Sequence, residues 1–331
     1  MSDWRRWAVR AKLASPALLL ALLILPLLTN DNNILTTAVL AFIIAALASS
    51  WNIVGGFTGQ ISLGHAAFFG IGALVTRLLW MQDVPFFASF LAGGIAATIA
   101  ALILGFPGLR LHGIYFAIGT LALAEAIRIT VGSVLPRVTA LPAELLRSYN
   151  LTSRYYLSLG VLVLTVLVSA YLTRSKVGLG MMTVREDEDA ARAIGVDVFR
   201  HKLFAFSLSA GLAGLAGGSF AYFHVSYYPS LAFSPEWTFD ALIVTFVGGI
   251  GTLAGPLIGA VFFVLAQDFV QDVLPANFVG AHLLVFGILF LLVVLMLPGG
   301  LMEAWEKLRE RRQTRAQKKD ATPIQQSTPS P

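Results

Sequence analysis

The sequence predicts an all-α polytopic membrane protein, with about ten transmembrane helices and Gly-rich helix breaks. Of its 331 residues, 57% are hydrophobic and only 12% are charged, whereas an ordinary soluble domain carries about twice that share of charge. The apolar residues are gathered into long runs, and a helix needs roughly 20 such residues to cross about 30 Å of hydrocarbon. We expect each run to be helical because lipid offers the backbone no hydrogen-bonding partners.

The first apolar run covers residues 13–28 and follows a basic amino terminus at 1–12. It resembles a secretory signal, but residues 29–32 supply no small-x-small cleavage site, so we interpret it as an uncleaved span. The first strongly polar loop lies at 174–202. Five further predicted spans precede this loop and four follow it: 34–54, 61–80, 86–106, 114–134, 156–173, 203–224, 237–249, 256–274 and 281–297.

Basic residues indicate the orientation of these spans. An even number of spans on each side of the polar loop places residues 1–12, the loop and a tail at 301–331 on one side, with a transmembrane domain at 13–300. All three polar segments are rich in Lys and Arg, which favours the cytoplasm. The even count requires 237–274 to form two spans, although its first part is short for a crossing; one broken segment is the alternative. The tail ends in Pro, Gln, Ser and Thr, so disorder is the default expectation there.

The residue types that are missing exclude several kinds of chemistry. The chain has no cysteine and five dispersed histidines, so the sequence contains neither a thiolate site nor a metal-ligand spacing. No Gly-rich stretch ends in Gly-Lys-Ser or Gly-Lys-Thr, the signature of a loop that holds ATP. The basic residues flank predicted spans and do not gather with aromatics on one polar face, which favours a lipid bilayer over nucleic acid as the partner. We therefore predict no catalytic residues, no metal, no cofactor and no enzymatic activity.

Two Gly-rich segments, at 55–65 and 248–256, interrupt otherwise apolar runs. Glycine at this density breaks a helix, and free backbone groups at membrane depth are tolerated only against protein or a water-filled cavity. Paired breaks in the two halves of a transporter indicate a binding site. The residues that we predict to line a substrate pathway are Thr58, Gly59, Gln60, Ser62, His65, Gly249, Gly251 and Thr252. The alternative is that the glycines allow close helix packing and the polar groups bond across helices.

Charged residues also lie inside predicted spans. Glu125 and Arg128 are three positions apart and therefore share one helix face. An intramembrane charged pair is a functional hypothesis by default, and mutual neutralisation is the structural alternative. Arg77 lies one turn from the outer end of its span, where we expect its side chain to reach the headgroups.

Within the polar loop, residues 183–195 have the features of a short solvated helix, with its body at 185–194. Thr183 and Glu186 have the spacing of a capping box, and Gly195 suits the left-handed position that follows a helix. Opposite charges four positions apart support such a helix. Two pairs have this spacing: Arg185 with Asp189, and Glu188 with Arg192.

The same segment resembles a known motif. Asp189-Ala190-Ala191 followed by Gly195 is similar to the Glu-Ala-Ala-x-x-x-Gly coupling motif of bacterial ABC importer permeases, with Asp in place of Glu. In that motif a short cytoplasmic helix docks in a groove of the ATPase subunit. From about residue 34 to 300, longer stretches look like the LivM-type permeases of branched-chain amino acid transporters: GGFTGQISLGHAAFFGIGAL (55–74), LRLHGIYFAIGTLALAEAIRI (109–129), VGLGMMTVREDEDAARAIGVDVFRHKLFAFSLSAGLAGLAGG (177–218) and GGIGTLAGPLIGA (248–260).

This resemblance implies a permease subunit of an ATP-binding-cassette importer for Leu, Ile and Val in the bacterial inner membrane, with both termini in the cytoplasm. It also implies a LivH-type partner permease that shares the pore, two ATPase subunits that hydrolyse ATP, and a periplasmic substrate-binding protein. The residues expected to contact an ATPase subunit are Arg185, Glu188, Asp189, Ala190, Ala191, Arg192 and Gly195.

Two alternatives remain open. Relatives of the family carry urea and short amides, so either cargo would be compatible with the resemblance. An ion-gradient-driven secondary transporter is the alternative from a different class, because it too would have broken helices and a buried charged pair. It would leave the coupling-type loop without a purpose.

Overall fold

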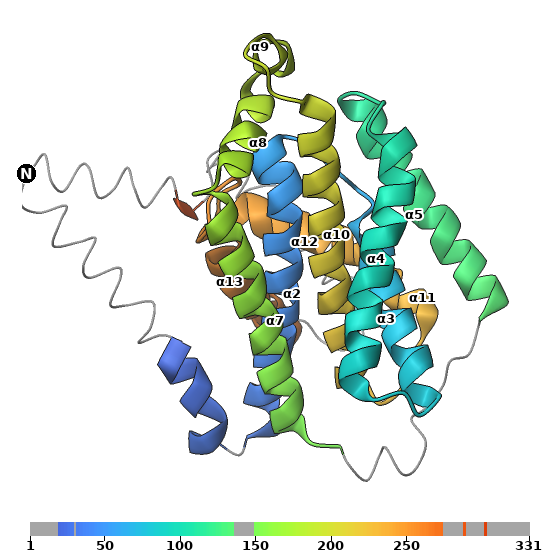
Figure 1. Cartoon of the computed structure of the whole chain (residues 1–331). Coiled ribbons are helices and arrows are strands. Elements are labelled where there is room, and N and C mark those ends of the chain that lie inside the picture. The colour runs from blue at the N-terminus through green and yellow to red at the C-terminus, as the bar shows by residue number, and fades with distance from the viewer. Residues whose placement is uncertain (1–18, 30, 136–148, 274–286, 289–300, 303–331) are drawn as a thin grey trace, which may run out of the picture.

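The computed structural model describes residues 19–29, 31–135, 149–273, 287–288 and 301–302, and every regular element within these ranges is a helix (Figure 1). By length and composition, five of the described helices could cross a membrane. They are α2 (Asn32–Asn52) with its extension η1 (Ile53–Phe57), α4 (Phe86–Gly108), α5 (Ile114–Val134), α7 (Leu151–Leu172) and α10 (Val198–Phe223). Shorter apolar helices cover Leu19–Leu28, α3 (His65–Met81) and most of α13 (Gly255–Val273).

The prediction of an all-α membrane protein is therefore confirmed for the described residues, and the chain is a multi-pass membrane protein. The predicted count of about ten spans includes segments beyond the described ranges. The amino terminus at 1–12 lies outside them, and so does nearly all of the last predicted span at 281–297 and of the tail at 301–331.

Helix caps move several boundaries away from the predicted spans. The side chain of Asn150 accepts a hydrogen bond from Thr152 N at 2.9 Å, so α7 begins well before the predicted start at residue 156. Asp197 caps α10 in the same way, which places the first turn of α10 inside the predicted polar loop. The α3 helix begins only at His65, after the non-helical residues 59–64. Capping side chains satisfy the first backbone N–H groups of a helix and thereby select its start.

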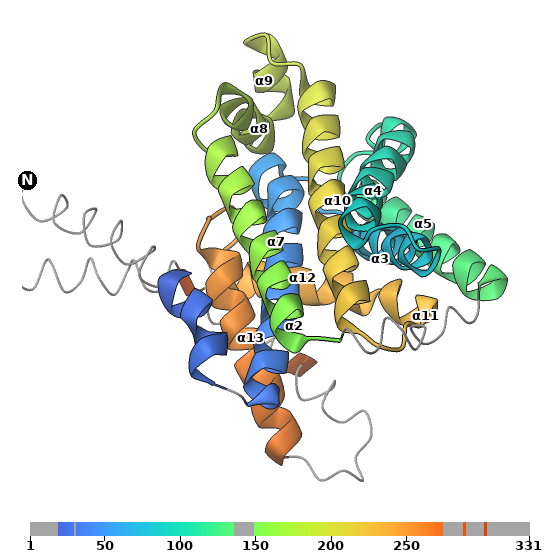
Figure 2. The same cartoon turned by 60° about the horizontal axis from the view of Figure 1, so that its bottom comes forward.

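The α10 helix lies between α2 and α7 on one side and α3 and α4 on the other, as Figures 1 and 2 show. Glycines bring its backbone close to α3. A Cβ atom on Gly72 would lie 2.1 Å from the carbonyl oxygen of Gly214, and one on Gly217 would lie 1.9 Å from that of Phe69. Such contacts are possible only without a side chain, which is the usual way that membrane helices approach closely. The packing of α3 on α10 therefore depends on glycine at these positions.

The region predicted at 237–274 forms two helices, α12 (Glu236–Gly248) and α13, which pack against each other and are separated by a break. A short helix, α11 (Pro229–Ala232), precedes them. With 13 residues, α12 rises only about 20 Å, less than the hydrocarbon thickness of about 30 Å. It therefore cannot cross the bilayer as a straight helix by itself.

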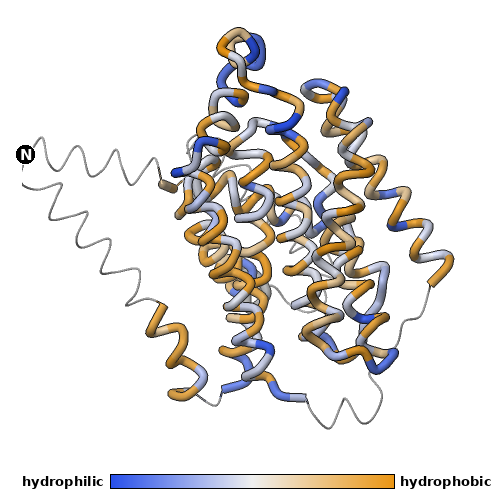
Figure 3. Tube along the Cα trace, in the orientation of Figure 1, coloured by the Kyte–Doolittle hydropathy of each residue, from blue (hydrophilic) through white to orange (hydrophobic). Residues whose placement is uncertain are grey.

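The polar loop forms two short helices, α8 (Lys176–Glu186) and α9 (Glu188–Ala193), which project from one end of the bundle (Figure 1). Figure 3 shows that hydrophilic residues gather at this projection, whereas the long helices are largely hydrophobic along their length. The contrast fits a segment in water at the end of a bundle in lipid.

The expectation that Arg77 reaches the headgroups is wrong, because this side chain is fully buried. Its Nη1 donates to the carbonyl oxygens of Ala221 and His224, and its Nη2 donates to that of Val225 at 2.6 Å. Arg154, which lies just before the predicted span 156–173, is also buried, and its Nε donates to Tyr222 O at 2.8 Å.

These acceptors lie at and just after the carboxyl end of α10. The last carbonyls of a helix lack partners within the helix and carry the negative end of its dipole. Two buried guanidinium groups, one from α3 and one from α7, therefore satisfy and neutralise this end of α10.

Replacing Arg77 with Leu should destabilise the protein, because each buried carbonyl that loses its donor costs about 1–3 kcal/mol. We expect the melting temperature of the detergent-solubilised protein to fall by several degrees. Arg174→Leu removes an exposed arginine and serves as the control, for which little change is expected. Equal melting temperatures for the two variants would contradict the capping role of Arg77.

Candidate functional site

The first helix break begins where α2 widens into the π-helical turn η1 and continues through the irregular residues 59–64. The side chain of Thr58 and the backbone N–H of Gln60 both donate to Val54 O, the latter at 3.0 Å. Both side chains are buried. Gly59 between them has φ +70°, a left-handed conformation that glycine adopts without strain. π-turns of this kind are rare and frequently occur at functional sites.

His65 joins the end of this break to two other helices. Its Nε2 lies 2.7 Å from Ser209 Oγ, and Ser209 Oγ donates its own hydrogen to Ser50 O at 2.6 Å. The histidine must therefore donate from Nε2, which leaves Nδ1 to accept from Ser62 Oγ at 3.3 Å. His65 and Ser62 are fully buried. His65 thus makes the kind of cross-helix bond that we weighed as the alternative, whereas the hydroxyl of Ser62 bonds only within its own segment, to His65 and to Gly64 N.

The second break covers residues 249–254, between α12 and α13. Gly249 and Gly251 have φ values of +127° and +76°, which favour glycine at both positions. Thr252 Oγ1 donates to Gly249 O at 2.8 Å and accepts from Gly255 N at 3.0 Å. Thr252 thus closes the turn and helps to start α13.

The two breaks meet at the end of α2 through the side chain of Asn52. Its Oδ1 accepts from Gly251 N at 2.8 Å, and its Nδ2 donates to Thr252 O at 2.8 Å. A Cβ atom on Gly56 would lie 2.7 Å from Gly251 N and 2.0 Å from Asn52 Oδ1. Sequence reasoning selected both breaks but missed Asn52. The available signal was an amide side chain inside the apolar predicted span 34–54, three positions before the first Gly-rich segment.

The segment that resembles the coupling motif, residues 183–195, is called the coupling segment below. It differs from the single helix predicted at 185–194. Asp187 is extended, with φ −160° and ψ 120°, and divides the segment into α8 and α9. Its side chain accepts from the N–H groups of Asp189 and Ala190, so Asp187 caps α9 in place of the predicted capping box. Gly195 has the predicted left-handed conformation, with φ +87°.

One of the two predicted ion pairs forms as expected, between Arg192 and Glu188 at 3.3 Å. Arg192 also pairs with Asp189 at 2.5 Å. The other predicted partner of Asp189, Arg185, is directed elsewhere and donates from Nη1 to Gly56 O at 2.7 Å. The extended residue between α8 and α9 explains the change, because the four-residue spacing no longer places Arg185 beside Asp189.

The two alanines of the motif have different environments. Ala190 is exposed, whereas Ala191 is fully buried in a small cluster with Val184 and Val198. Our expectation that both alanines are surface contacts is therefore wrong for Ala191. Its small side chain lets α9 lie against α8 and α10.

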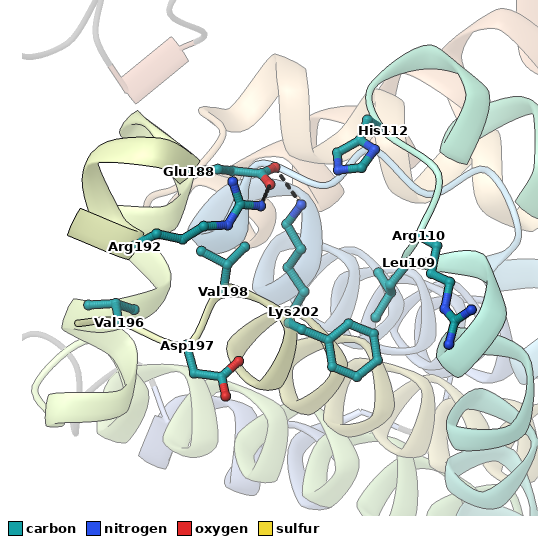
Figure 4. A pocket seen from close by; sticks show the side chains of 10 residues that line it. Leu109, Arg110, His112, Glu188, Arg192, Val196, Asp197, Val198 and Lys202 are labelled. Carbon is teal, nitrogen blue, oxygen red and sulfur yellow. Dashed lines mark hydrogen bonds and ion pairs between the residues drawn. The ribbon is translucent and has the colours of Figure 1, made fainter. Parts of the chain in front are cut away.

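A pocket of about 430 Å³ lies beside α9. It is lined by Leu109, Arg110, His112, Glu188, Arg192, Val196, Asp197, Val198, Phe199 and Lys202. Figure 4 shows Glu188 between Arg192 and Lys202, with Arg110 and His112 on the opposite wall. Lys202 is nearly fully buried and its Nζ contacts Glu188, which fastens α9 to α10. Sequence reasoning counted Lys202 only as an orienting charge.

Glu125 and Arg128 form the predicted pair on α5, with Arg128 Nε donating to Glu125 Oε2 at 2.8 Å. The two side chains are 37% and 35% exposed, so the pair is only partly covered by the described residues. The α5 helix that carries the pair touches the first break one turn earlier, where Thr120 Oγ1 accepts from Leu63 N at 3.0 Å.

Known proteins resemble this chain over most of its length. Residues 33–294 match the family model described as the branched-chain amino acid transport system permease component. The high-affinity branched-chain amino acid transport system permease proteins LivM of Salmonella typhimurium and of Escherichia coli are each 30% identical to this chain, over 89% of it and 75% of their own length. The corresponding protein LivH of Salmonella typhimurium is 23% identical, over 78% of this chain and 90% of its own. This chain belongs to the family of permease components of branched-chain amino acid transport systems.

Proposed function

We propose that this chain is the transmembrane permease subunit of an ATP-binding-cassette importer, and that it carries Leu, Ile and Val across the bacterial inner membrane. The observation that carries the proposal is a family match over residues 33–294 in a chain whose polar loop contains a capped helix, α9, that projects from the bundle. A permease component moves its cargo and is not itself a catalyst. ATP hydrolysis is then the task of separate subunits.

The partners in this proposal are a LivH-type permease, two ATPase subunits and a periplasmic substrate-binding protein. Large apolar side chains on the outer faces of α4 and α5 support a second permease or lipid as neighbour. Examples are Phe87, Ile103 and Ile118, which are 70%, 66% and 55% exposed. Apolar faces of this extent are expected on helices that meet lipid or another membrane subunit.

The predicted pathway residues divide by exposure. Gly59 is exposed, and Gly251 and Thr252 are half-buried. We assign these three to the surface of the passage. The others are buried and would support that surface from behind: Thr58, Gln60, Ser62, His65 and Gly249.

The proposal predicts uptake that needs every partner. Proteoliposomes containing this chain, the LivH-type permease and both ATPase subunits should accumulate radiolabelled leucine only with binding protein and ATP. A non-hydrolysable ATP analogue is the control. Uptake of urea or a short amide in place of leucine would correct the cargo. Uptake driven by an ion gradient without the ATPase subunits would overturn the importer and favour a secondary transporter.

The orientation predicts opposite labelling at the two ends of the bundle. The native chain has no cysteine, so a single introduced cysteine reports its own position. Asp187→Cys, between α8 and α9, should be protected from an impermeant thiol reagent added to intact spheroplasts. Gln82→Cys, in the turn between α3 and α4, should react. The reverse pattern would place the coupling segment outside the cell.

The environments of the two alanines predict different failures. Ala190→Trp changes an exposed residue, for which the cost in stability is typically below about 0.5 kcal/mol. The permease should therefore reach the membrane but lose copurification of the ATPase, or the link between hydrolysis and uptake. Ala191→Trp should instead lower the amount of folded permease, because overpacking a tight core costs about 1–3 kcal/mol.

Ala193→Trp, on an exposed position nearer the end of α9, shows how far the docking surface extends. If the Ala190→Trp variant retains normal copurification, hydrolysis and uptake, α9 is a solvated connector and the docking surface lies elsewhere.

A further inference from the structure

Arg185 belongs to the segment of α8 and α9, where it is exposed, and its side chain reaches the end of α2. Its backbone lies in the last turn of α8, next to the extended residue Asp187. Its Nη1 donates to Gly56 O at 2.7 Å, inside the π-helical turn of the first break. Hydrogen bonds from a guanidinium are roughly twice as strong as those between neutral groups. The contact therefore fastens α8 to the end of α2.

The same side chain also lies against the second break. A Cβ atom on Gly251 would come within 2.4 Å of Arg185 Nη1 and within 3.2 Å of Gly56 O. A Cβ atom on Gly59 would lie 3.2 Å from Arg185 Cγ. Glycines of both breaks thus leave the space that this one side chain occupies. Asn52 also joins the two breaks, through Gly251 N and Thr252 O.

On its other side, α8 is held to α9 and α10. Val184, Ala191 and Val198 form one buried cluster from all three helices. The ion pair of Glu188 with the buried Lys202 adds a second attachment of α9 to α10. A force on α9 is therefore passed to α8 through packed contacts, and α8 carries Arg185.

We propose that Arg185 is a positioning residue that transmits displacement of the docking segment α8–α9 to both Gly-rich breaks at once. The inference rests on the proposed function for the source of that displacement, which is a docked ATPase subunit. The breaks are the places where the backbone lacks regular helical bonds, so they change conformation most readily. The guanidinium of Arg185 is bonded to Gly56 O, so a shift of Arg185 displaces the end of α2. The same guanidinium lies against Gly251, so the shift also displaces the segment that leads into α13.

The test uses the complete complex in proteoliposomes and compares Arg185→Ala with Arg185→Lys and with Arg200→Ala. Arg200 is an exposed arginine at the start of α10 that pairs with Asp197, so it controls for lost charge in the same region. We expect Arg185→Ala to retain the ATPase subunits and to hydrolyse ATP, but leucine uptake per ATP should fall roughly tenfold, within the range typical of coupling between two sites. Arg185→Lys should keep part of the coupling, since an ammonium can still donate to Gly56 O. Arg200→Ala should behave as the native chain.

A second measurement separates transmission from stability. Hydrogen–deuterium exchange is followed at residues 53–60 and 248–255 in the complex, with and without the ATPase subunits. In the native chain, docking of the ATPase should change exchange in both breaks. In Arg185→Ala, docking should change neither, although the ATPase subunits remain bound.

The two measurements separate the possible failures. If native complexes show no ATP-driven uptake, the proposed function fails, and the exchange experiment still decides whether Arg185 connects the segment to the breaks. If native complexes are coupled and Arg185→Ala is equally coupled, with the same docking-dependent exchange, the linkage is refuted alone. Loss of the ATPase subunits from Arg185→Ala would also overturn the proposal, because it would make Arg185 a docking contact.

Discussion

The hydrogen bonds of Asn52 decide how the two breaks in this helical bundle are arranged. A break leaves amide and carbonyl groups without helical partners, and lipid cannot satisfy them. One amide side chain offers both a donor and an acceptor, so Asn52 serves Gly251 N and Thr252 O together. The close approach requires that Gly56 have no side chain. Two segments that are 200 positions apart in sequence therefore form one junction.

The position of this junction connects the membrane core to the coupling segment. The η1 turn packs against α8, so the least regular backbone of the core lies beneath the helices that project from the bundle. Transport requires that the passage change shape while the helices around it remain folded. Glycines in left-handed conformations and a π-turn allow local change at small cost, whereas the interior of a regular helix does not. The arrangement thus places the most adaptable backbone next to the surface that a partner would move.

The α10 helix links this end of the bundle to the other. Near its start, the buried Lys202 holds α9 through Glu188. At its far end, Arg77 and Arg154 satisfy the last carbonyls, and glycines along its length fit it closely against α3. Charges inside a membrane protein are costly unless they are paired or hydrogen-bonded. Each of these three buried charges meets a partner from another helix, which makes α10 the element through which distant parts of the chain are held together.

The sequence alone determined the all-α membrane class, the extent of most helices, the location of both breaks and the polar loop between the spans, because hydrophobic runs, glycine density and charge runs are local properties. Only the tertiary structure decided which polar residues are buried and what they bind. Arg77 meets carbonyls that lie more than one hundred positions away, and Arg185 leaves its expected neighbour Asp189 for Gly56. Ala191 turns inward while Ala190 remains exposed. These choices depend on how helices distant in sequence approach one another, and no local pattern records that approach.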